Sequence, residues 1–152
     1  MRSLSVPANV RNLKNPLVSS PELLQHAARH FADHCANCHG NDGRGDTEIG
    51  RGLYPRAPNM QLAATQQLSD GELYYIIQNG VRWTGMPGWG EAGDHDDSWQ
   101  LVLFIRHLPN LTEAEIRDMA RFNPRSPAEI EEEREEQEFL KGATDNVGAK
   151  KK

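Results

Sequence analysis

Both cysteines of the chain lie in one short stretch, Cys35-Ala-Asn-Cys38, and a histidine, His39, follows directly. Cys-x-x-Cys-His is the sequence at which haem c is attached. Two thiols at this spacing, near the end of a helix, can reach two carbons on one porphyrin edge, and the next residue brings an imidazole under the iron. We therefore predict one covalently bound haem c, with Cys35 and Cys38 as thioethers and His39 as an axial ligand.

Three other interpretations use the same residues. A zinc site needs four ligands, and no second Cys-x-x-Cys or paired histidine motif stands at a usable distance. A thioredoxin-like redox pair belongs in a βαβ context, whereas the flanking sequence has a helical pattern. The third is a chance match. Haem attachment uses both thiols and the histidine together, and it is the interpretation that we favour.

A second axial ligand is predicted at Met86, in the stretch Trp-Thr-Gly-Met-Pro-Gly-Trp that covers residues 83–89. Gly85 allows the backbone to approach the porphyrin closely, and Pro87 prevents the segment from continuing as a helix. A thioether held on such a loop can bind the distal face of the iron. The alternative is that Met86 fills a gap in the core.

Other ligand candidates are weaker. Met60 follows His39 closely in sequence, and Met119 belongs to an amphipathic pattern beyond the core. His95 and His107 are the reserve ligands if Met86 does not bind. Three further histidines recur at a spacing of four residues and are expected to be solvated, with a second metal site as the alternative; they are His26, His30 and His34.

Two residues beside Met86 could contact the haem. For Arg82, pairing with a haem propionate and a solvated side chain are both open. For Trp83, the functional interpretation is a haem contact with its indole N–H donated to a propionate, and the alternative is ordinary core packing.

Composition sets bounds on the rest. The 152 residues are 37% hydrophobic and carry a net charge of −5, which indicates one small domain with an appendage and argues against a nucleic-acid partner. No apolar run is long enough to span a bilayer, and the first 20 residues lack the apolar centre of a secretory signal. If the protein is exported, we expect its signal or anchor to lie outside this chain.

The residues with chemistry are positioned by three predicted core helices. The first begins with Ser20 as N-cap and runs into the cysteine motif. The second begins with a capping box at Ser69 and ends at Gly80. The third covers about 96 to 108 and stops before Pro109. Between them, the segment from Gly40 to Thr65 and the stretch around Met86 are predicted as loops. Loops this long are unusual in a compact domain, so something besides helix–helix contact must order them, and a large apolar cofactor would do so.

Beyond Pro109 we predict two more helices, capped at Thr112 and Ser126. Residues 129–138 carry seven glutamates and one arginine. A solubilising surface is the simpler interpretation of this charge, and docking to a basic partner is the alternative. The resulting division is an extended lead-in or linker (1–19), a haem domain (20–109), a helical extension (110–141) and a disordered tail (142–152).

The order of a helix, Cys-x-x-Cys-His, a Gly/Pro-rich loop, a helix, Gly-Met-Pro-Gly-Trp and a closing helix resembles the monohaem class I cytochromes c of bacteria. The resemblance covers about Ser20 to Pro109 and does not extend to the C-terminal residues. It implies an all-α cytochrome c fold in which the first and last core helices cross near Phe31 and near Trp99 to Leu108.

The family's ligand roles fall on His39 and Met86, and its thioether roles fall on the two cysteines. The family also uses a proline carbonyl to accept a hydrogen bond from the proximal imidazole, which orients the ring. Pro58 is the candidate for this role, with Pro55 in reserve.

With both axial positions filled, the iron has no vacant site, so the resemblance implies a one-electron carrier rather than an enzyme. The expected partners are respiratory or oxidoreductase proteins, and the expected location is the periplasm, with an N-terminal membrane tether outside this chain. The alternative is a haem enzyme or ligand-binding sensor in which Met86 is absent from the iron or easily displaced.

Overall fold

The structure is a computed structural model that describes residues 6–90 and 95–148, with side chains as far as residue 141. Within these ranges the chain forms helices and turns and no β-strand, which confirms the predicted all-α fold class. None of the helices in the described ranges has the length and hydropathy needed to cross a bilayer.

The helices are α1 (Ala8–Arg11), α2 (Pro21–His30), α3 (Ala36–His39), α4 (Glu48–Gly52), α5 (Ala63–Gln66), α6 (Asp70–Asn79), α7 (His95–His107), α8 (Glu113–Met119) and α9 (Pro127–Gly148). A π-helical turn (Phe31–Cys35) joins α2 to α3, and 3-10 turns (Leu108–Asn110 and Ala120–Phe122) follow α7 and α8. The three core helices predicted from sequence correspond to α2 with α3, α6 and α7.

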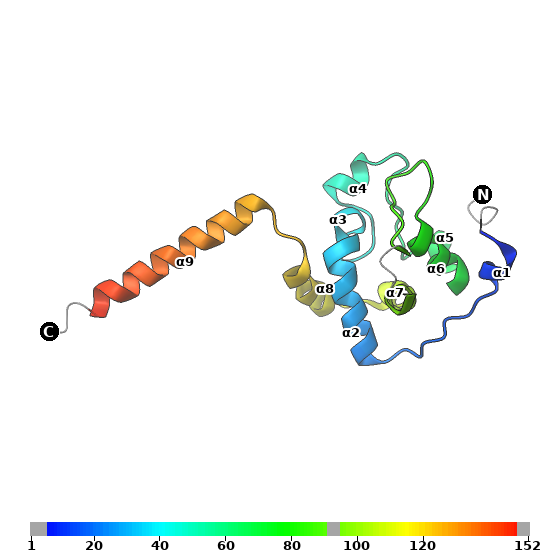
Figure 1. The fold of residues 1–152 in the computed structure, drawn as a ribbon, viewed down its shortest axis with the longest axis horizontal. Helices are drawn as coiled ribbons and strands as arrows, with labels where there is room; N and C mark the ends of the chain where they lie inside the picture. Colours follow the sequence, from blue (N-terminus) through cyan, green and yellow to red (C-terminus); the bar gives the residue numbers. More distant parts are fainter. Residues whose placement is uncertain (1–5, 91–94, 149–152) are drawn as a thin grey trace.

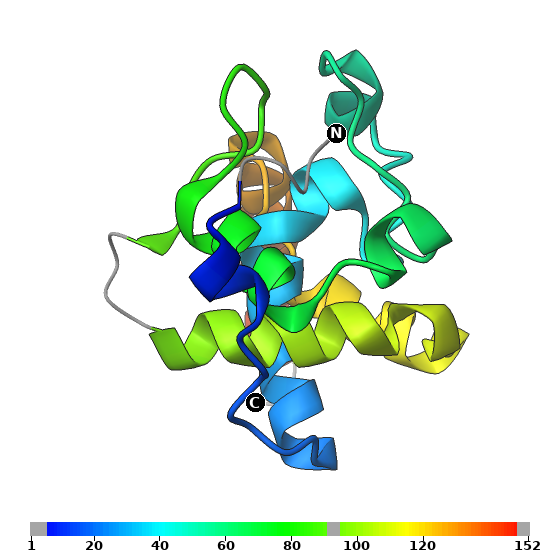
Figure 2. The ribbon, with the colours of Figure 1, turned by 90° about the vertical axis from the view of Figure 1, so that its right-hand side faces the viewer.

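The centre of the molecule is the crossing of α2 and α7, which Figure 2 shows with α7 lying across α2. Phe31 and Phe104 meet there with ring centroids 5.0 Å apart, and both side chains are fully buried. α6 packs against α7 and contributes Leu73 and Ile77 to the same core. The crossing predicted from the family resemblance is therefore present.

The predicted helix ends are confirmed where a side chain caps them. The Ser20 hydroxyl accepts a hydrogen bond from the Leu23 N–H at 3.2 Å, and Pro21 occupies the first position of α2. Ser69 and Glu72 form a reciprocal capping box at the start of α6. Gly80 ends that helix with a φ of 67°, a conformation that suits glycine.

The segment between Gly40 and Thr65, predicted as loop, contains two short helices, α4 and α5. Thr47 caps α4 by accepting the Gly50 N–H at 2.8 Å. Helices of four or five residues leave no apolar periodicity in the sequence, so the high content of glycine and proline hid them.

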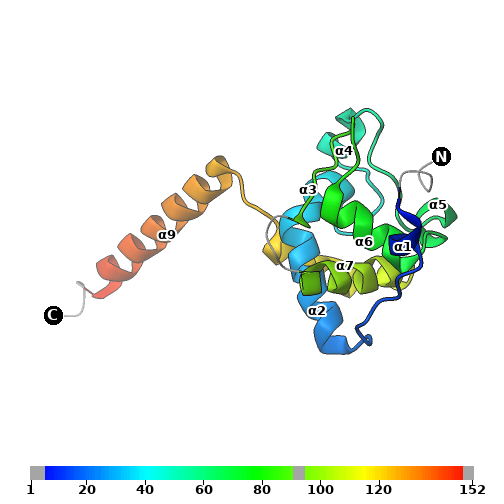
Figure 3. The same ribbon diagram turned by 45° about the vertical axis from the view of Figure 1, so that its right-hand side comes forward.

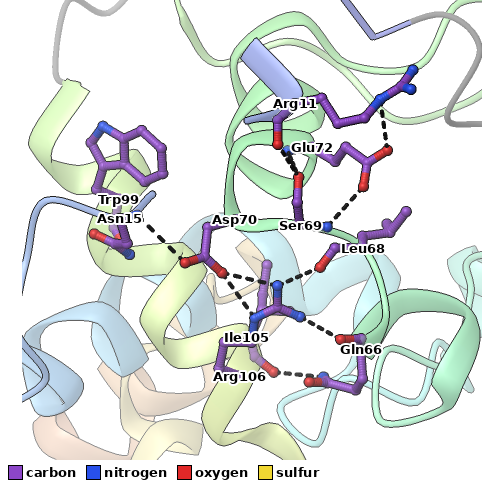
Figure 4. Close-up of polar contacts among 10 residues, drawn as sticks. All are labelled: Arg11, Asn15, Gln66, Leu68, Ser69, Asp70, Glu72, Trp99, Ile105 and Arg106. Atoms are coloured by element: carbon purple, nitrogen blue, oxygen red, sulfur yellow. Dashed lines mark hydrogen bonds and ion pairs between the residues drawn. The ribbon is translucent and has the colours of Figure 1, made fainter. Parts of the chain in front are cut away.

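The lead-in of residues 1–19 is not simply extended, because its described part contains α1 and lies against α6 and α7 (Figure 4). The Ser69 hydroxyl donates to the Arg11 carbonyl at 2.7 Å, and Arg11 faces Glu72 at 3.5 Å. Asn15 donates from Nδ2 to the Trp99 carbonyl at 2.9 Å. These contacts join residues separated by more than 50 positions, which no local pattern reveals.

A second set of polar contacts ties α7 to the start of α6 (Figure 4). The Arg106 guanidinium contacts Asp70 at 2.9 Å and donates to the carbonyls of Gln66, at 2.7 Å, and Leu68. The Gln66 side chain in turn donates to the Ile105 carbonyl at 2.9 Å. A guanidinium with five donors suits this position because several carbonyls converge on one point.

The last helix, α9, extends away from the remainder of the chain (Figures 1 and 3). All of its described side chains are exposed, including Ile130, Phe139 and Leu140. The helix runs to Gly148, whereas the sequence predicted its end near residue 141 and a disordered tail after it. Residues 142–148 contain no proline, and Gly142 costs only about 1 kcal/mol inside a helix. The second glycine of this stretch, Gly148, is the last residue of the helix.

Phe104 should be the side chain on which the α2–α7 crossing depends. We expect Phe104→Ala to destabilise the protein by about 3–5 kcal/mol, because it removes a fully buried ring from a packed core. Chemical denaturation of the mature protein measures this change. Phe139→Ala, in exposed α9, is the matched control and should change stability by less than about 0.5 kcal/mol. Equal effects of the two substitutions would contradict the assignment of the core.

Candidate haem-binding site

The cysteine motif lies where α2 passes through the π-helical turn into the four-residue helix α3. Ala36 is buried, whereas Cys35, Cys38 and His39 are each partly buried. Both cysteines are free thiols. A single turn of helix thus presents two thiols and an imidazole close together, as haem attachment requires.

The Cys35 thiol is poorly suited to the alternative chemistries. Burial, with a smaller contribution from the neighbouring Cys38, raises the pKa of Cys35 to about 12. The raised pKa makes the free thiolate, which is the nucleophile in disulfide exchange, less accessible than in an ordinary cysteine. No group of three or more His, Cys, Asp or Glu side chains that could hold a metal ion occurs in the part of the chain that the structure describes.

His39 has the properties of a ligand. Burial lowers its pKa, which favours the neutral imidazole with a free lone pair. Its Nδ1 atom is buried and has no hydrogen-bond partner in the structure, so the predicted bond to the Pro58 carbonyl is not formed here. Both residues adjoin Gly45, whose N–H donates to the His39 carbonyl at 2.7 Å and whose Cβ position would lie 3.0 Å from the Pro58 oxygen. The role of Pro58 stays a prediction.

The loop that follows the motif folds back onto it. The Thr47 hydroxyl lies 2.8 Å from the Asn37 carbonyl and 3.2 Å from the Cys38 carbonyl. Gly50 packs so closely that a Cβ atom there would lie 2.2 Å from the Cys38 oxygen. Sequence reasoning missed Thr47, because residue 50 is a glycine rather than the Glu or Gln of a capping box and the segment was predicted as loop.

Met86 lies in a tight loop between α6 and α7. The Val81 N–H donates to the Met86 carbonyl at 3.1 Å, and the Met86 N–H donates to the Thr84 hydroxyl at 3.1 Å. Met86 is only partly buried, whereas Met60 and Met119 belong to the buried core. Of the three methionines in the described residues, Met86 is therefore the one whose thioether is not already packed in the core.

The Met86 loop and the α4 segment rise at the same end of the molecule, on either side of α3 (Figure 2). They touch each other, because a Cβ atom on Gly85 would lie 2.5 Å from the Leu53 side chain. The segments also carry exposed apolar side chains, Ile49 and Tyr54 on one and Trp83 on the other. Exposed apolar side chains on the two segments that flank α3 fit the surroundings that a haem requires.

Arg82 and Trp83 point into solvent in this structure. Trp83 is 97% exposed and has a φ of 62°, an uncommon conformation for a bulky residue. Neither side chain touches the core, which disagrees with core packing as the explanation of Trp83. Their proposed contacts with haem propionates stay predictions.

The remaining histidines are engaged in other contacts. His95 pairs with the Tyr74 hydroxyl at 2.5 Å, and His107 pairs with Glu115 at 2.9 Å. The three histidines on the first core helix also face separate partners; His26 contacts Gln100, His30 contacts Asp97 and His34 contacts the Trp89 ring. The His30 and His34 rings also pack edge to face, with centroids 4.7 Å apart. No third ligand-type side chain joins this pair in a metal-binding group within the described residues, so the geometry does not support a second metal site.

Crossed core helices, a Cys-x-x-Cys-His motif on the first and a methionine loop before the last define a c-type cytochrome domain. Residues 22–105 match the family model described as "Cytochrome C oxidase, cbb3-type, subunit III". This match covers more than half of the chain, which therefore belongs to that family. The resemblance to monohaem class I cytochromes c is confirmed, and electron transfer is the function of the domain.

Two curated relatives are both described as "Cbb3-type cytochrome c oxidase subunit FixP". The protein from Rhizobium meliloti (strain 1021) is 36% identical over 91 residues, and that from Sinorhizobium medicae (strain WSM419) is 38% identical over 91 residues. Each match covers 59% of this chain and 29% of the relative. The chain thus corresponds to less than a third of the length of either relative.

Gly50 and Gly52 offer a test of how the loop packs against the motif. We expect Gly50→Ala to lower the stability of the mature protein by about 1–3 kcal/mol, because its Cβ would collide with the Cys38 backbone. Gly52→Ala, on the same helix, meets nothing within 4 Å and should be neutral or stabilising by up to about 1 kcal/mol. Thermal unfolding followed by haem absorbance measures both. A tolerated Gly50→Ala would show that the loop does not pack on the motif as described.

Proposed function

We propose that this domain is a one-electron carrier with a single haem c, bound through Cys35 and Cys38 and ligated by His39 and Met86. The observation that carries the proposal is the placement of both free thiols and a neutral imidazole on one helical turn, with a methionine outside the core on the facing loop. A haem bound here supplies a one-electron change at its iron.

The protein residues have separate roles in this proposal. Cys35 and Cys38 fix one edge of the porphyrin, so that the cofactor cannot dissociate. His39, whose pKa is lowered by burial, would supply one ligand to the iron as a neutral imidazole. Met86 would supply the other, and Met/His ligation raises the reduction potential relative to other ligand pairs.

Filled axial positions favour electron transfer over catalysis at the metal. A substrate would need to displace Met86, whose loop is held by its own backbone and hydroxyl hydrogen bonds. The hydrogen bonds of Arg106 tie α7 to the start of α6, and the lead-in is hydrogen-bonded to α6. A core connected in this way favours the same protein conformation in both oxidation states. We therefore infer that the domain has no enzymatic activity of its own.

We further propose that the domain passes electrons within a cbb3-type oxidase, on the periplasmic side of the membrane. The names of the two relatives, which describe both as subunits of a cbb3-type oxidase, support the oxidase part of this proposal. Since the chain matches 29% of each relative, the proposal concerns the electron-carrying part of such a subunit. A membrane tether before the lead-in is part of the same proposal.

Met86→Ala tests the distal ligand. The oxidised protein should show a thioether-to-ferric-iron charge-transfer band that disappears in Met86→Ala, and the reduction potential should fall because a thioether stabilises ferrous iron. Visible spectroscopy and redox titration measure these changes. Met119→Leu, a substitution of similar volume in the core, is the control and should keep the band.

If the wild-type protein lacks this band and binds carbon monoxide readily, the carrier proposal is wrong. The domain would then be a haem enzyme or ligand sensor with an open distal site. A colourless protein, after expression in a host that attaches haem c, would exclude both.

The oxidase assignment is tested separately. Reduced domain, mixed with membranes that contain a cbb3-type oxidase, should be reoxidised faster than with membranes from a matched strain lacking that oxidase. Stopped-flow absorbance of the haem measures the rates. Equal rates would contradict the assignment while leaving the electron-carrier proposal in place.

A further inference from the structure

The C-terminal end of α3 would leave backbone carbonyls without partners, as the last turn of any helix does. Here the loop that follows α3 supplies hydrogen-bond donors to the carbonyls of Asn37, Cys38 and His39. Thr47 Oγ1 lies 2.8 Å from the Asn37 oxygen and 3.2 Å from the Cys38 oxygen. The Gly45 N–H donates to the His39 oxygen at 2.7 Å.

The Thr47 hydroxyl joins two helices through one atom. A hydroxyl has one proton and two acceptor lone pairs. Thr47 uses the proton toward the Asn37 carbonyl, with the Cys38 carbonyl close enough to share it, and accepts the Gly50 N–H at 2.8 Å. The same atom therefore caps α4 and holds the end of α3.

The loop that carries Thr47 also packs against residues 57 and 58, which restrict its movement. Gly45 has a φ of 71°, and a Cβ atom there would lie 2.4 Å from the Ala57 carbonyl oxygen. The Ala57 N–H donates to the Gly50 carbonyl at 3.1 Å. Because Gly50 also packs against the Cys38 oxygen, the motif, α4 and the segment before Pro58 form one tightly packed unit.

We propose that Thr47 is a positioning residue for the haem site: its hydroxyl holds the backbone of Asn37 and Cys38 and so fixes the orientation of the His39 imidazole. The orientation of an axial imidazole and the groups that support it tune the metal that it binds. This inference rests on the proposed function, since it assigns the proximal ligand to His39.

The competing explanation is that Thr47 is an ordinary helix cap. Thr112 provides the comparison, because it caps α8 in the same way, accepting the Glu115 N–H at 3.2 Å. The hydrogen bonds of Thr112 and Glu115 join them to each other and to His107, not to the cysteine motif. Valine at either position removes the cap, but only at residue 47 does it also remove a donor from the motif.

The experiment compares Thr47→Val, Thr47→Ser, Thr47→Asp and Thr112→Val in the mature haem protein. Aspartate still caps α4 as an acceptor but cannot donate to the two carbonyls, whereas serine keeps both functions. We expect Thr47→Val to shift both the low-spin ferric EPR g values and the reduction potential. For Thr47→Asp the g values are the measurement that decides, because the added carboxylate would change the potential whatever the role of Thr47. Thr47→Ser and Thr112→Val should match the wild type in both measurements.

The inference is overturned if Thr47→Asp keeps wild-type g values, because capping alone would then explain the residue. It is also overturned if Thr112→Val shifts them equally. Should Thr47→Val fail to mature, Thr47→Asp still decides, since its helix cap is intact. A wild-type protein without a low-spin haem signal would instead reject the proposed function on which the inference rests.

Discussion

Phe31 and Phe104 meet where α2 and α7 cross, and this contact determines where the chain can place its cysteines. Phe31 is the first residue of the π-helical turn that ends at Cys35. A π-helical turn is rare, and such turns are frequent at functional sites. Because the Phe31 side chain is buried in the core, the position of the π-helical turn is fixed. The cysteine motif that follows the turn is therefore held beside the core, where its side chains are only partly buried. The packing of the core therefore also determines the position of the candidate site.

The parts of the fold that follow local rules could be predicted from the sequence. The starts of α2 and α6 were found because Ser20 and Ser69 are caps whose partners lie three residues away. The docking of the lead-in was not, since the contacts of Arg11 and Asn15 involve residues distant in sequence. The two short helices α4 and α5 were missed because four or five residues carry no measurable periodicity.

The candidate site likewise contains residues that could be predicted from the sequence and one that could not. Cys35, Cys38 and His39 form a contiguous motif, so their association needed no knowledge of the fold. The choice of Met86 over other methionines depended on its loop, and the structure agrees with that choice to the extent that Met60 and Met119 are in the core. Thr47 could not be found, because its importance arises from two carbonyls that only the folded loop brings within reach.

The isolation of α9 has a consequence for how the molecule unfolds. Its described side chains are all exposed, and in the part that the structure describes it is supported by a cap at Ser126 and by exposed ion pairs such as Arg134 with Glu131. Exposed pairs of this kind contribute little, and a helix without tertiary packing is marginal in water. The far-ultraviolet dichroism of the whole chain therefore combines a gradual helix–coil transition with the cooperative melting of the haem domain. A single midpoint fitted to that signal describes neither process.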